Sequence, residues 1–414
     1  MTPRRIEIGA EVHAGSRSEG LFYCDDCVSR LEALLPEYEG RIKLIYMDPP
    51  YLTGDRFYMR VRVGEDGWKS GRGGMAVESF ADPRDRGMYM DMMRRVLVTC
   101  RRLMSNEGMI FVHIDYRVQP HMRLLMDELF GEENFLNEII WVYQSGGRSV
   151  RHFSRKHDVI LFYRKTDRYD FNIDAVKAPP AAPRSNHMRR HVDPDGRVYR
   201  SIKVGGRVYT YYDDDPVAPS DVWSDLSHLQ QKDPERTGYD TQKPLALMER
   251  IVKCASREGD WVLDPFAGSG TTLEAARRNG RNFIGIDCQR LTMNIARRRL
   301  NGASWRLYGA DNAWEVEAVC RASVNPGIGF YHVCLEGFEV DVPGLPEGAS
   351  PMDCVDNWSV GYLRDGDYHV MADYVRTRRH GGLERELRAP MYAGQLAMCV
   401  SDVLGRSWYF ALDR

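Results

Sequence analysis

The chain is 414 residues long, and 43% of its residues are hydrophobic and 28% are charged. This globular composition excludes a disordered or fibrous protein, while the length predicts two or three domains. The net charge of −2, averaged over the whole chain, gives no sign of a nucleic-acid partner.

Export and membrane signals are not found in the sequence. No run of ~18 apolar residues occurs, and the first residues lack the apolar stretch of a secretion signal, so we expect a cytoplasmic protein with no membrane contact. The nine cysteines are scattered and odd in number, which favours reduced thiols. Cys24 and Cys27 have metal-like spacing, but a zinc site needs a second pair, so we expect no metal.

Strand and helix patterns alternate over the first 164 residues. The expected strands cover residues 41–47, 109–114, 138–143 and 159–163, and the expected helices cover 31–39, 88–104 and 120–130. This alternation predicts βαβ units and a mostly parallel sheet. Residues 53–86 interrupt it, because they are rich in Gly, Arg and Asp with little periodicity, and they predict a long mobile loop.

The pattern changes again over residues 165–235. Prolines, a glycine pair and an aspartate run separate short strand-like pieces such as 207–211, which predicts a module inserted on the sheet. Helices are expected again at 244–256 and 271–279, with strands at 261–263 and 282–286. We therefore expect an α/β domain in two parts (1–164 and 236–310), an insert (165–235) and a β-rich C-terminal unit (311–414).

Positive charge is concentrated around the insert. Between residues 151 and 210 there are fourteen Lys or Arg and six Asp, a net charge of +8, so the rest of the chain sums to −10. A basic segment beside an acidic remainder is typical of an element that faces phosphate, although a solvated arginine-rich loop gives the same pattern.

A glycine-rich turn follows the strand at 261–263, with the sequence Asp264-Pro265-Phe266-Ala267-Gly268-Ser269-Gly270-Thr271. Such a turn brings backbone N–H groups close to a ligand at a helix N-terminus. It lacks the ending of a P-loop and the three glycines of a dinucleotide fingerprint. Asp287, after the next strand, can accept both hydroxyls of a ribose. A nucleoside without phosphate fits, and S-adenosylmethionine is the common one.

Asp48-Pro49-Pro50-Tyr51 follows the strand at 41–47, at the sheet edge where ligands bind in open α/β folds. The amino group of a nucleobase is a poor nucleophile, because its lone pair is delocalised into the ring. A carboxylate and a proline-stiffened carbonyl that accept its two hydrogens let the nitrogen become pyramidal toward an electrophilic methyl group. An aromatic ring beside them can stack on the base.

With both motifs in this order, the chain resembles the amino-methylating DNA methyltransferases of the β class, in particular the adenine-specific modification subunits of type III restriction systems. The similarity runs over about residues 21–300 and includes 97–115, 130–135 and 238–245. It implies an α/β fold, namely a Rossmann-like S-adenosylmethionine-dependent methyltransferase sheet with an inserted target-recognition module. It also implies S-adenosylmethionine as cofactor and double-stranded DNA as substrate.

The resemblance implies roles for individual residues. Asp48 and Pro50, with Pro49 between them, would bind the target amino group, and Tyr51 would stack on the flipped base. Asp287 would hold the ribose of the cofactor, and Asp26 would lie near its adenine. The rest of the cofactor would be wrapped by Asp264, Phe266, Ala267, Gly268, Ser269, Gly270 and Thr271, and closed over by Thr241, Gln242 and Lys243.

DNA contacts are expected from two basic segments. The insert supplies Arg184, Arg189, Arg190, Arg197, Arg200 and Lys203, and the segment that the family places near the flipped base supplies Arg148, Arg151, Arg155 and Lys156. Taking a base out of the duplex costs a few kcal/mol. Stacking on Tyr51 and contacts with phosphate would offset part of this cost.

Several alternatives stay open. Methylation of cytosine N4 uses the same chemistry, although Asp rather than Ser at position 48 favours adenine, as the resemblance implies. Methylation of cytosine C5 is excluded, because it needs a Pro-Cys nucleophile that the chain lacks. A non-catalytic DNA-binding subunit is disfavoured by the intact Asp48, Tyr51, Asp264 and Asp287. The C-terminal unit could grip DNA, form a homodimer or dock a restriction subunit.

Overall fold

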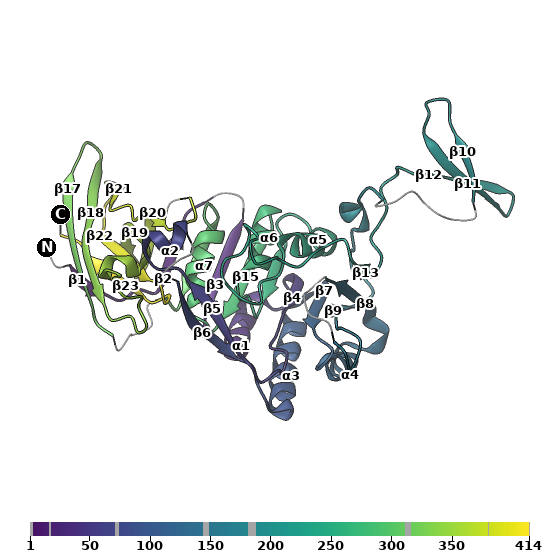
Figure 1. Cartoon of the computed structure of the whole chain (residues 1–414), viewed down its shortest axis with the longest axis horizontal. Helices are drawn as coiled ribbons and strands as arrows, with labels where there is room; N and C mark the ends of the chain where they lie inside the picture. The colour runs from purple at the N-terminus through teal and green to yellow at the C-terminus, as the bar shows by residue number, and fades with distance from the viewer. Residues whose placement is uncertain are drawn as a thin grey trace.

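The computed structural model describes residues 3–15, 18–70, 74–143, 149–180, 188–310, 316–379 and 381–413. One 15-stranded sheet runs along the length of the molecule (Figure 1). Its strand order is β1-β23-β22-β19-β20-β2-β16-β3-β15-β14-β4-β7-β9-β8-β13.

Six neighbouring strands in the middle of this sheet pair in parallel. They are β16 (Ser304–Tyr308), β3 (Glu19–Cys24), β15 (Asn282–Asp287), β14 (Trp261–Asp264), β4 (Ile42–Met47) and β7 (Met104–Ile114). Beyond them β9 (His157–Arg164) lies antiparallel between β7 and β8 (Phe135–Val142). The expected α/β fold with a mostly parallel central sheet is confirmed.

Helices cover both faces of the parallel strands. One face carries α1 (Cys27–Tyr38), α3 (Arg86–Leu103) and α4 (Gln119–Phe130), and the other carries α5 (Leu245–Ala255), α6 (Thr271–Arg278) and α7 (Leu291–Arg299). Strand β4 shows why this arrangement forms. Leu44 and Tyr46 pack into one core and Ile45 and Met47 into the other, so the strand must be buried on both sides.

Residues 53–86 do not form the long mobile loop that the sequence predicts. They contain β5 (Arg56–Val61), α2 (Gly64–Lys69) and β6 (Met75–Ala81), and β5 and β6 pair as an antiparallel hairpin. Met59 and Val61 point into a small core with Tyr239, while Arg56 and Arg60 alternate with them on the exposed side. This period of two identifies a strand. The charged residues around it kept the alternation from being recognised in the sequence.

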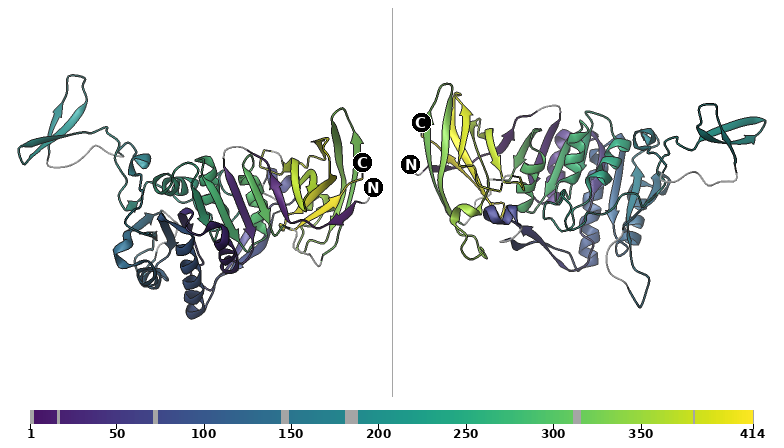
Figure 2. Two further views of the ribbon diagram at one scale, coloured as in Figure 1. Left: turned by 180° about the vertical axis from the view of Figure 1, so that it is seen from behind. Right: turned by 45° about the horizontal axis from the view of Figure 1, so that its top comes forward.

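The middle of the predicted insert stands apart from the large sheet, whereas residues on either side of it, such as Tyr169 and Leu226, pack against the main core. Strands β10 (Arg189–Val192), β11 (Val198–Val204) and β12 (Arg207–Tyr212) form a separate three-stranded sheet. This small sheet projects from one end of the molecule, far from the C-terminal strands (Figures 1 and 2). Strand β13 (Val222–Trp223) also falls within residues 165–235, but it pairs with β8 in the large sheet.

The C-terminal residues extend the large sheet. Strands β19 (Val355–Arg364), β20 (Asp367–Val375), β22 (Gln395–Asp402) and β23 (Ser407–Ala411) join it through β2 (Ala10–His13), which pairs with β20. Strand β1 (Arg4–Ile6) pairs with β23 at the outer edge of the sheet. A separate sheet contains β17 (Ala318–Pro326), β18 (Phe330–Val340) and β21 (Glu386–Pro390). None of the described helices is long and apolar enough to cross a membrane.

A buried charge cluster connects the C-terminal strands to the α/β domain. Glu11 of β2 accepts bonds from Arg297 of α7 at 2.9 and 2.7 Å and from the Tyr409 hydroxyl at 2.6 Å. Although burial alone would raise the pKa of Glu11, Arg297 and His13 hold it well below its usual value. The cluster therefore keeps its charges in the folded state.

Removing the Glu11 carboxylate should destabilise the fold strongly. In Glu11→Ala the Arg297 guanidinium stays buried without its main partner, which costs about 3–5 kcal/mol when one member of a buried ion pair is lost. Urea unfolding of both proteins measures this loss. The matched control is Glu7→Ala at an exposed site, where we expect a change of at most about 0.5 kcal/mol. Equal stabilities of the two variants would contradict the role of the cluster.

Candidate active site

Asp48 lies at the carboxyl end of the fully buried strand β4, and the two prolines that follow it end the strand. Its Oδ1 accepts a hydrogen bond from the Tyr51 hydroxyl at 2.5 Å. Burial and the nearby Asp48 raise the pKa of Tyr51 well above its usual value, so the phenol stays protonated and donates. The motif is thus folded back on itself, with the carboxylate and the ring in contact.

The glycine-rich turn follows the neighbouring strand β14. Asp264 ends this strand, and its Oδ1 accepts a bond from the Phe266 N–H at 3.0 Å. Gly268 has φ of 49°, and a Cβ there would lie 3.2 Å from the ring of Tyr239. Glycine is therefore needed here both for its backbone conformation and for the close packing of the turn. Gly270, with φ of 70°, caps the start of α6.

Asp287 ends the next strand, β15, and is buried beside the turn. Its Oδ2 accepts a bond from the Gly268 N–H at 2.8 Å, and its Oδ1 accepts one from the Gln289 N–H at 2.8 Å. Burial raises the pKa of Asp287 to about 6. Burial, with the nearby Asp48 and Asp287, raises the pKa of Asp264 to about 7. Both carboxyl groups thus titrate close to neutral pH.

These motifs share one cavity of about 330 Å³ at the carboxyl ends of the parallel strands. All four residues of the Asp48–Tyr51 motif line it. So do most of the residues expected at the cofactor: Asp26, Thr241, Lys243, Asp264, Phe266, Ala267, Gly268, Ser269, Thr271 and Asp287. Gly270 is not among the lining residues. Gln242 is not either: its side-chain amide bonds Thr237 and Glu235, so it holds the preceding turn.

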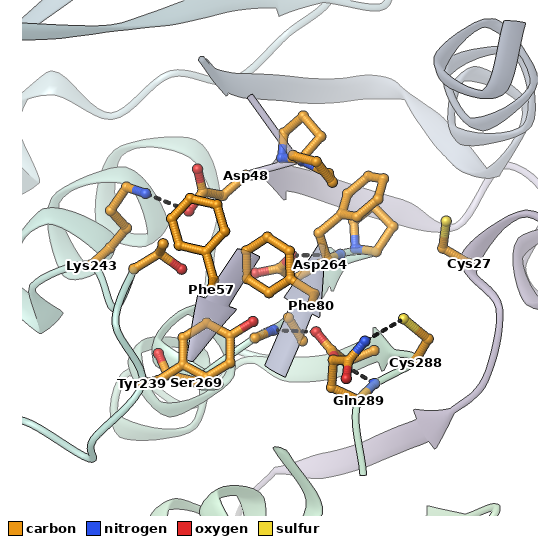
Figure 3. A pocket seen from close by; sticks show the side chains of 18 of the residues that line it. Cys27, Asp48, Phe57, Phe80, Tyr239, Lys243, Asp264, Ser269, Cys288 and Gln289 are labelled. Atoms are coloured by element: carbon orange, nitrogen blue, oxygen red, sulfur yellow. Dashed lines mark hydrogen bonds and ion pairs between the residues drawn. The ribbon is translucent and has the colours of Figure 1, made fainter. Parts of the chain in front are cut away.

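Four lining residues with large rings were not expected from the sequence: Tyr46, Phe57, Phe80 and Tyr239. Phe57 and Phe80 come from the β5–β6 hairpin, and their rings stack 4.7 Å apart in the cavity (Figure 3). Tyr239 continues this stack, 6.4 Å from Phe80. Tyr239 lies within the segment 238–245 that supports the family resemblance, but only the fold brings the hairpin to it. Asp82, at the end of the hairpin, also lines the cavity and bonds Thr53.

Lys243 lies beside Asp48 in the cavity (Figure 3). Its Nζ donates to Asp48 Oδ2 at 2.5 Å and to the Tyr51 hydroxyl at 3.2 Å. Lys243 was expected at the cofactor, and its contact with the other motif was not expected. The two partners are 195 residues apart in the chain.

A buried polar network lies behind Tyr51. His113 of β7 is fully buried and bonds the Tyr46 hydroxyl at 2.9 Å and Asp158 at 3.3 Å, and Asp158 also accepts from Tyr143 at 3.0 Å. The ring of Tyr51 lies over that of His113, with centroids 6.4 Å apart. The network satisfies these buried polar groups and supports the ring from one side.

The expected DNA contacts divide into three groups. Arg148 and Arg184 lie outside the described residues. Arg151, Arg155, Arg189, Arg190 and Lys203 are exposed, and Lys156 is half-buried. Arg197 and Arg200 instead form ion pairs within the small sheet, with Asp214 and Asp215 and with Asp213 respectively. Their charges are therefore partly neutralised by an aspartate run that follows the basic stretch.

Both faces of the small sheet carry aromatic rings, but Tyr209 and Tyr211 on one face are exposed, whereas Tyr199 and Tyr212 on the other are half-buried. Register and alternation place one set of side chains on the same face, which we call the aromatic face: Arg190, Val192, Val198, Arg200, Ile202, Val204, Arg207, Tyr209 and Tyr211. Five of its large hydrophobic residues are exposed, namely Val192, Ile202, Val204, Tyr209 and Tyr211. Arg189 and Lys203 point to the opposite face. Arg207 was not among the expected DNA contacts, because only the strand register places it beside Tyr209 on this face.

A family model described as DNA methylase matches residues 42–298, which include both motifs and the insert between them. The chain belongs to the DNA methylase family. It is 30% identical over 267 residues to the DNA adenine methyltransferase YhdJ of Escherichia coli, covering 64% of this chain and 77% of that protein. It is 29% identical to the type II methyltransferase M.EcaI of Enterobacter cloacae, covering 60% of this chain.

The match spans 62% of the length of M.EcaI. Among solved structures, the DNA modification methylase TTHA0409 of Thermus thermophilus shares 20% identity at a TM-score of 0.42, covering 71% of this chain and all of that one. The cytosine-N4-specific PvuII DNA methyltransferase shares 16% identity at a TM-score of 0.43, covering 72% of this chain and 98% of that one.

The cofactor of a DNA methylase is S-adenosylmethionine, and the cavity fits its chemistry. Ligand sites typically measure about 300–1,000 Å³, so 330 Å³ is at the lower end of that range. Aspartates and aromatic rings line the cavity and suit a ligand with a sulfonium and an ammonium group, because carboxylates and ring faces both attract cations. Lys243 adds one positive charge to the lining of the cavity.

The raised pKa of Asp264 predicts a pH-dependent effect of Asp264→Asn. Between about pH 4 and 7 the folded protein holds a proton that the unfolded chain has lost, so stability falls as the pH rises through this range. Asparagine has no charge to bury, so we expect the variant to gain Tm relative to the wild type at pH 8 and much less at pH 5. Thermal melts at both pH values measure this difference.

Asp91→Asn, at an exposed site on α3, is the matched control. Its Tm should follow that of the wild type at both pH values. An Asp264→Asn gain that is the same at pH 5 and pH 8 would contradict a carboxyl group that titrates near neutrality.

Proposed function

We propose that the chain transfers a methyl group from S-adenosylmethionine to the N6 amino group of adenine in double-stranded DNA, acting on a base flipped out of the duplex. The observation that carries this proposal is the meeting of Asp48, Asp264 and Asp287 in one cavity at the ends of three adjacent parallel strands. A carboxylate that can accept an amine and a site for a nucleoside are thereby brought within reach of each other.

The chain's own residues would prepare the amine for attack. Asp48 accepts one amino hydrogen and a backbone carbonyl of the proline pair accepts the other, which directs the nitrogen lone pair out of the ring plane. The bound cofactor supplies the electrophilic methyl group. Transfer of that methyl group from the cofactor sulfur would leave the nitrogen with one proton to lose, and Asp48 would accept it. Tyr51 holds the base by stacking.

The cofactor would follow the glycine-rich turn. We assign the ribose to Asp287 and the methionine and sulfonium part to the segment from Asp264 to Thr271. Lys243 and Thr241 take the methionine end, and Asp26 lies toward the cofactor adenine. The stacked rings of Phe57 and Phe80 add an apolar wall from the β5–β6 hairpin.

Adenine is favoured over cytosine on two grounds. Position 48 is Asp rather than Ser, which the resemblance to the β class associates with adenine. In addition, the relative from Escherichia coli is named a DNA adenine methyltransferase. M.EcaI is a type II methyltransferase, and we extend to this chain the role of a modification enzyme in a restriction–modification system.

DNA would be held by the small projecting sheet through its aromatic face. Arg190 and Arg207 supply charge for phosphates, while Tyr209 and Tyr211 offer flat rings to sugars and bases. Among the described residues, Arg190 makes no ion pair that would neutralise it. A protein surface of this kind, basic and aromatic together, is typical of nucleic-acid contacts.

Purified protein incubated with labelled S-adenosylmethionine and unmethylated genomic DNA should yield labelled N6-methyladenine. Digestion to nucleosides and mass spectrometry identify the product, and sequencing of the modified DNA gives the target site. In Asp48→Ala the label should fall by at least 100-fold, because the amine loses its acceptor. N4-methylcytosine would overturn the choice of base alone. Cofactor binding without any label would favour the non-catalytic subunit instead.

Two neighbouring arginines on opposite faces of β10 test the DNA surface. Arg190→Ala should weaken duplex binding and reduce the slope of log affinity against log salt by about 1, the value for one lost phosphate contact. Arg189→Ala, which removes the same charge from the other face, should leave both quantities nearly unchanged. Fluorescence anisotropy over a salt series measures them. Equal effects of the two substitutions would contradict the choice of face.

A further inference from the structure

Both carboxylate oxygens of Asp48 are engaged by donors of the chain itself. The Tyr51 hydroxyl donates to Oδ1 at 2.5 Å, and Lys243 Nζ donates to Oδ2 at 2.5 Å. Lys243 also bonds the Tyr51 hydroxyl at 3.2 Å, which closes a triangle of three side chains. Each oxygen of the carboxylate that the proposed reaction needs therefore already accepts one hydrogen bond from the chain. A target amine must share or replace one of these donors.

Lys243 is the donor that can move. Its backbone is held where its carbonyl oxygen accepts a bond from Thr271 Oγ1 at 3.2 Å, so the flexible four-carbon stem carries the motion. Tyr51, by contrast, lies only three residues from Asp48 and has its ring against His113. Releasing Oδ2 would need only a rotation of the lysine side chain.

The charges around the cavity show where the ammonium group would go. Among the described residues that line the cavity, Lys243 is the only lysine or arginine, whereas five aspartates line it: Asp26, Asp48, Asp82, Asp264 and Asp287. S-adenosylmethionine carries one anionic group, its α-carboxylate. In this acidic cavity that carboxylate has a single cationic partner available, and the partner is the residue that holds Asp48.

We propose that Lys243 is a positioning residue shared between Asp48 and the cofactor α-carboxylate. Without cofactor, Lys243 stays bonded to Asp48 Oδ2 and to the Tyr51 hydroxyl, and it blocks the approach of the target amine to Oδ2. When the cofactor binds, the ammonium group turns to its carboxylate and leaves Asp48 Oδ2 to accept the target amine. Cofactor binding and base binding are thereby coupled, and the cofactor binds before the flipped base. This inference rests on the proposed function and adds an order of binding to it.

The first test compares two ligands that differ in the amino-acid end. S-adenosylhomocysteine carries the α-carboxylate, whereas 5′-methylthioadenosine keeps the nucleoside and lacks it. Isothermal titration of Lys243→Gln should show roughly 10–100-fold weaker binding of S-adenosylhomocysteine, the range for a lost charge-assisted bond. Binding of 5′-methylthioadenosine should be unchanged. Lys253→Gln, on α5 outside the cavity, removes the same charge and should match the wild type for both ligands.

Asp48→Asn should change the affinity for S-adenosylhomocysteine in the opposite direction. With the carboxylate neutralised, Lys243 is no longer held, so S-adenosylhomocysteine should bind several-fold more tightly than to the wild type. Binding of 5′-methylthioadenosine should again stay the same. A purely structural role of the ion pair would weaken ligand binding in both variants, so the opposite signs identify sharing. Thermal melts of each variant establish that it is folded.

The second test measures base flipping directly. A duplex with the mapped target site carries the fluorescent analogue 2-aminopurine next to the target adenine, so the target keeps its 6-amino group and flipping it relieves the stacking that quenches the analogue. In the wild type and in Lys253→Gln, fluorescence should rise only after S-adenosylhomocysteine is added. In Lys243→Gln the fluorescence should rise to a similar level without that ligand, because no lysine is bonded to Asp48 Oδ2 in this variant.

The outcomes separate the two proposals. Normal affinity of Lys243→Gln for S-adenosylhomocysteine, or flipping that still depends on the ligand in that variant, would overturn the sharing of Lys243 and leave the proposed function intact. If the wild type binds neither ligand and transfers no methyl group to DNA, the proposed function itself fails. Tighter binding by Asp48→Asn together with weaker binding by Lys243→Gln supports the coupling.

Discussion

The site depends on the parallel pairing of β14 between β4 and β15. This pairing brings together strands that are more than 200 residues apart in the chain, with Val262 opposite Leu44 and Phe283. Because successive side chains of β4 alternate between the two cores, a slip of one residue would reverse which of them each side chain enters. The hydrophobic register therefore fixes the relative heights of Asp48, Asp264 and Asp287 at one edge of the sheet.

Grouping these carboxylates has an energetic cost that follows from the same geometry. Asp264 and Asp287 are buried, and burial disfavours their ionised forms. Backbone N–H groups of Phe266, Gly268 and Gln289 offset part of this cost. The remainder makes the cavity less stable empty than filled by a ligand with cationic groups. The same buried carboxyl groups therefore lower the stability of the fold and raise the affinity of the site for such a ligand.

Much of this arrangement could be predicted from the sequence, because its elements have strong local signals. The apolar run of β4, the helical spacing in α3 and the turn after Asp264 each identify themselves within a few residues. The hairpin of β5 and β6 was missed, since charged residues alternate with its apolar ones. The neutralisation of Arg197 and Arg200 was missed for another reason. It depends on strand pairing that brings Asp213, Asp214 and Asp215 back beside them.

The small projecting sheet buries little apolar surface. A three-stranded sheet has little core of its own, and this one leaves five large hydrophobic side chains of its aromatic face in solvent. Burial of these side chains would stabilise the sheet by about 25 cal/mol per Å² of apolar surface, and their exposure leaves that free energy unused. Covering the face with a partner would recover part of that gain, while Arg190 and Arg207 on the same face favour a partner that carries negative charge. The features that make the sheet weak in isolation therefore also make it suited to bind a polyanion.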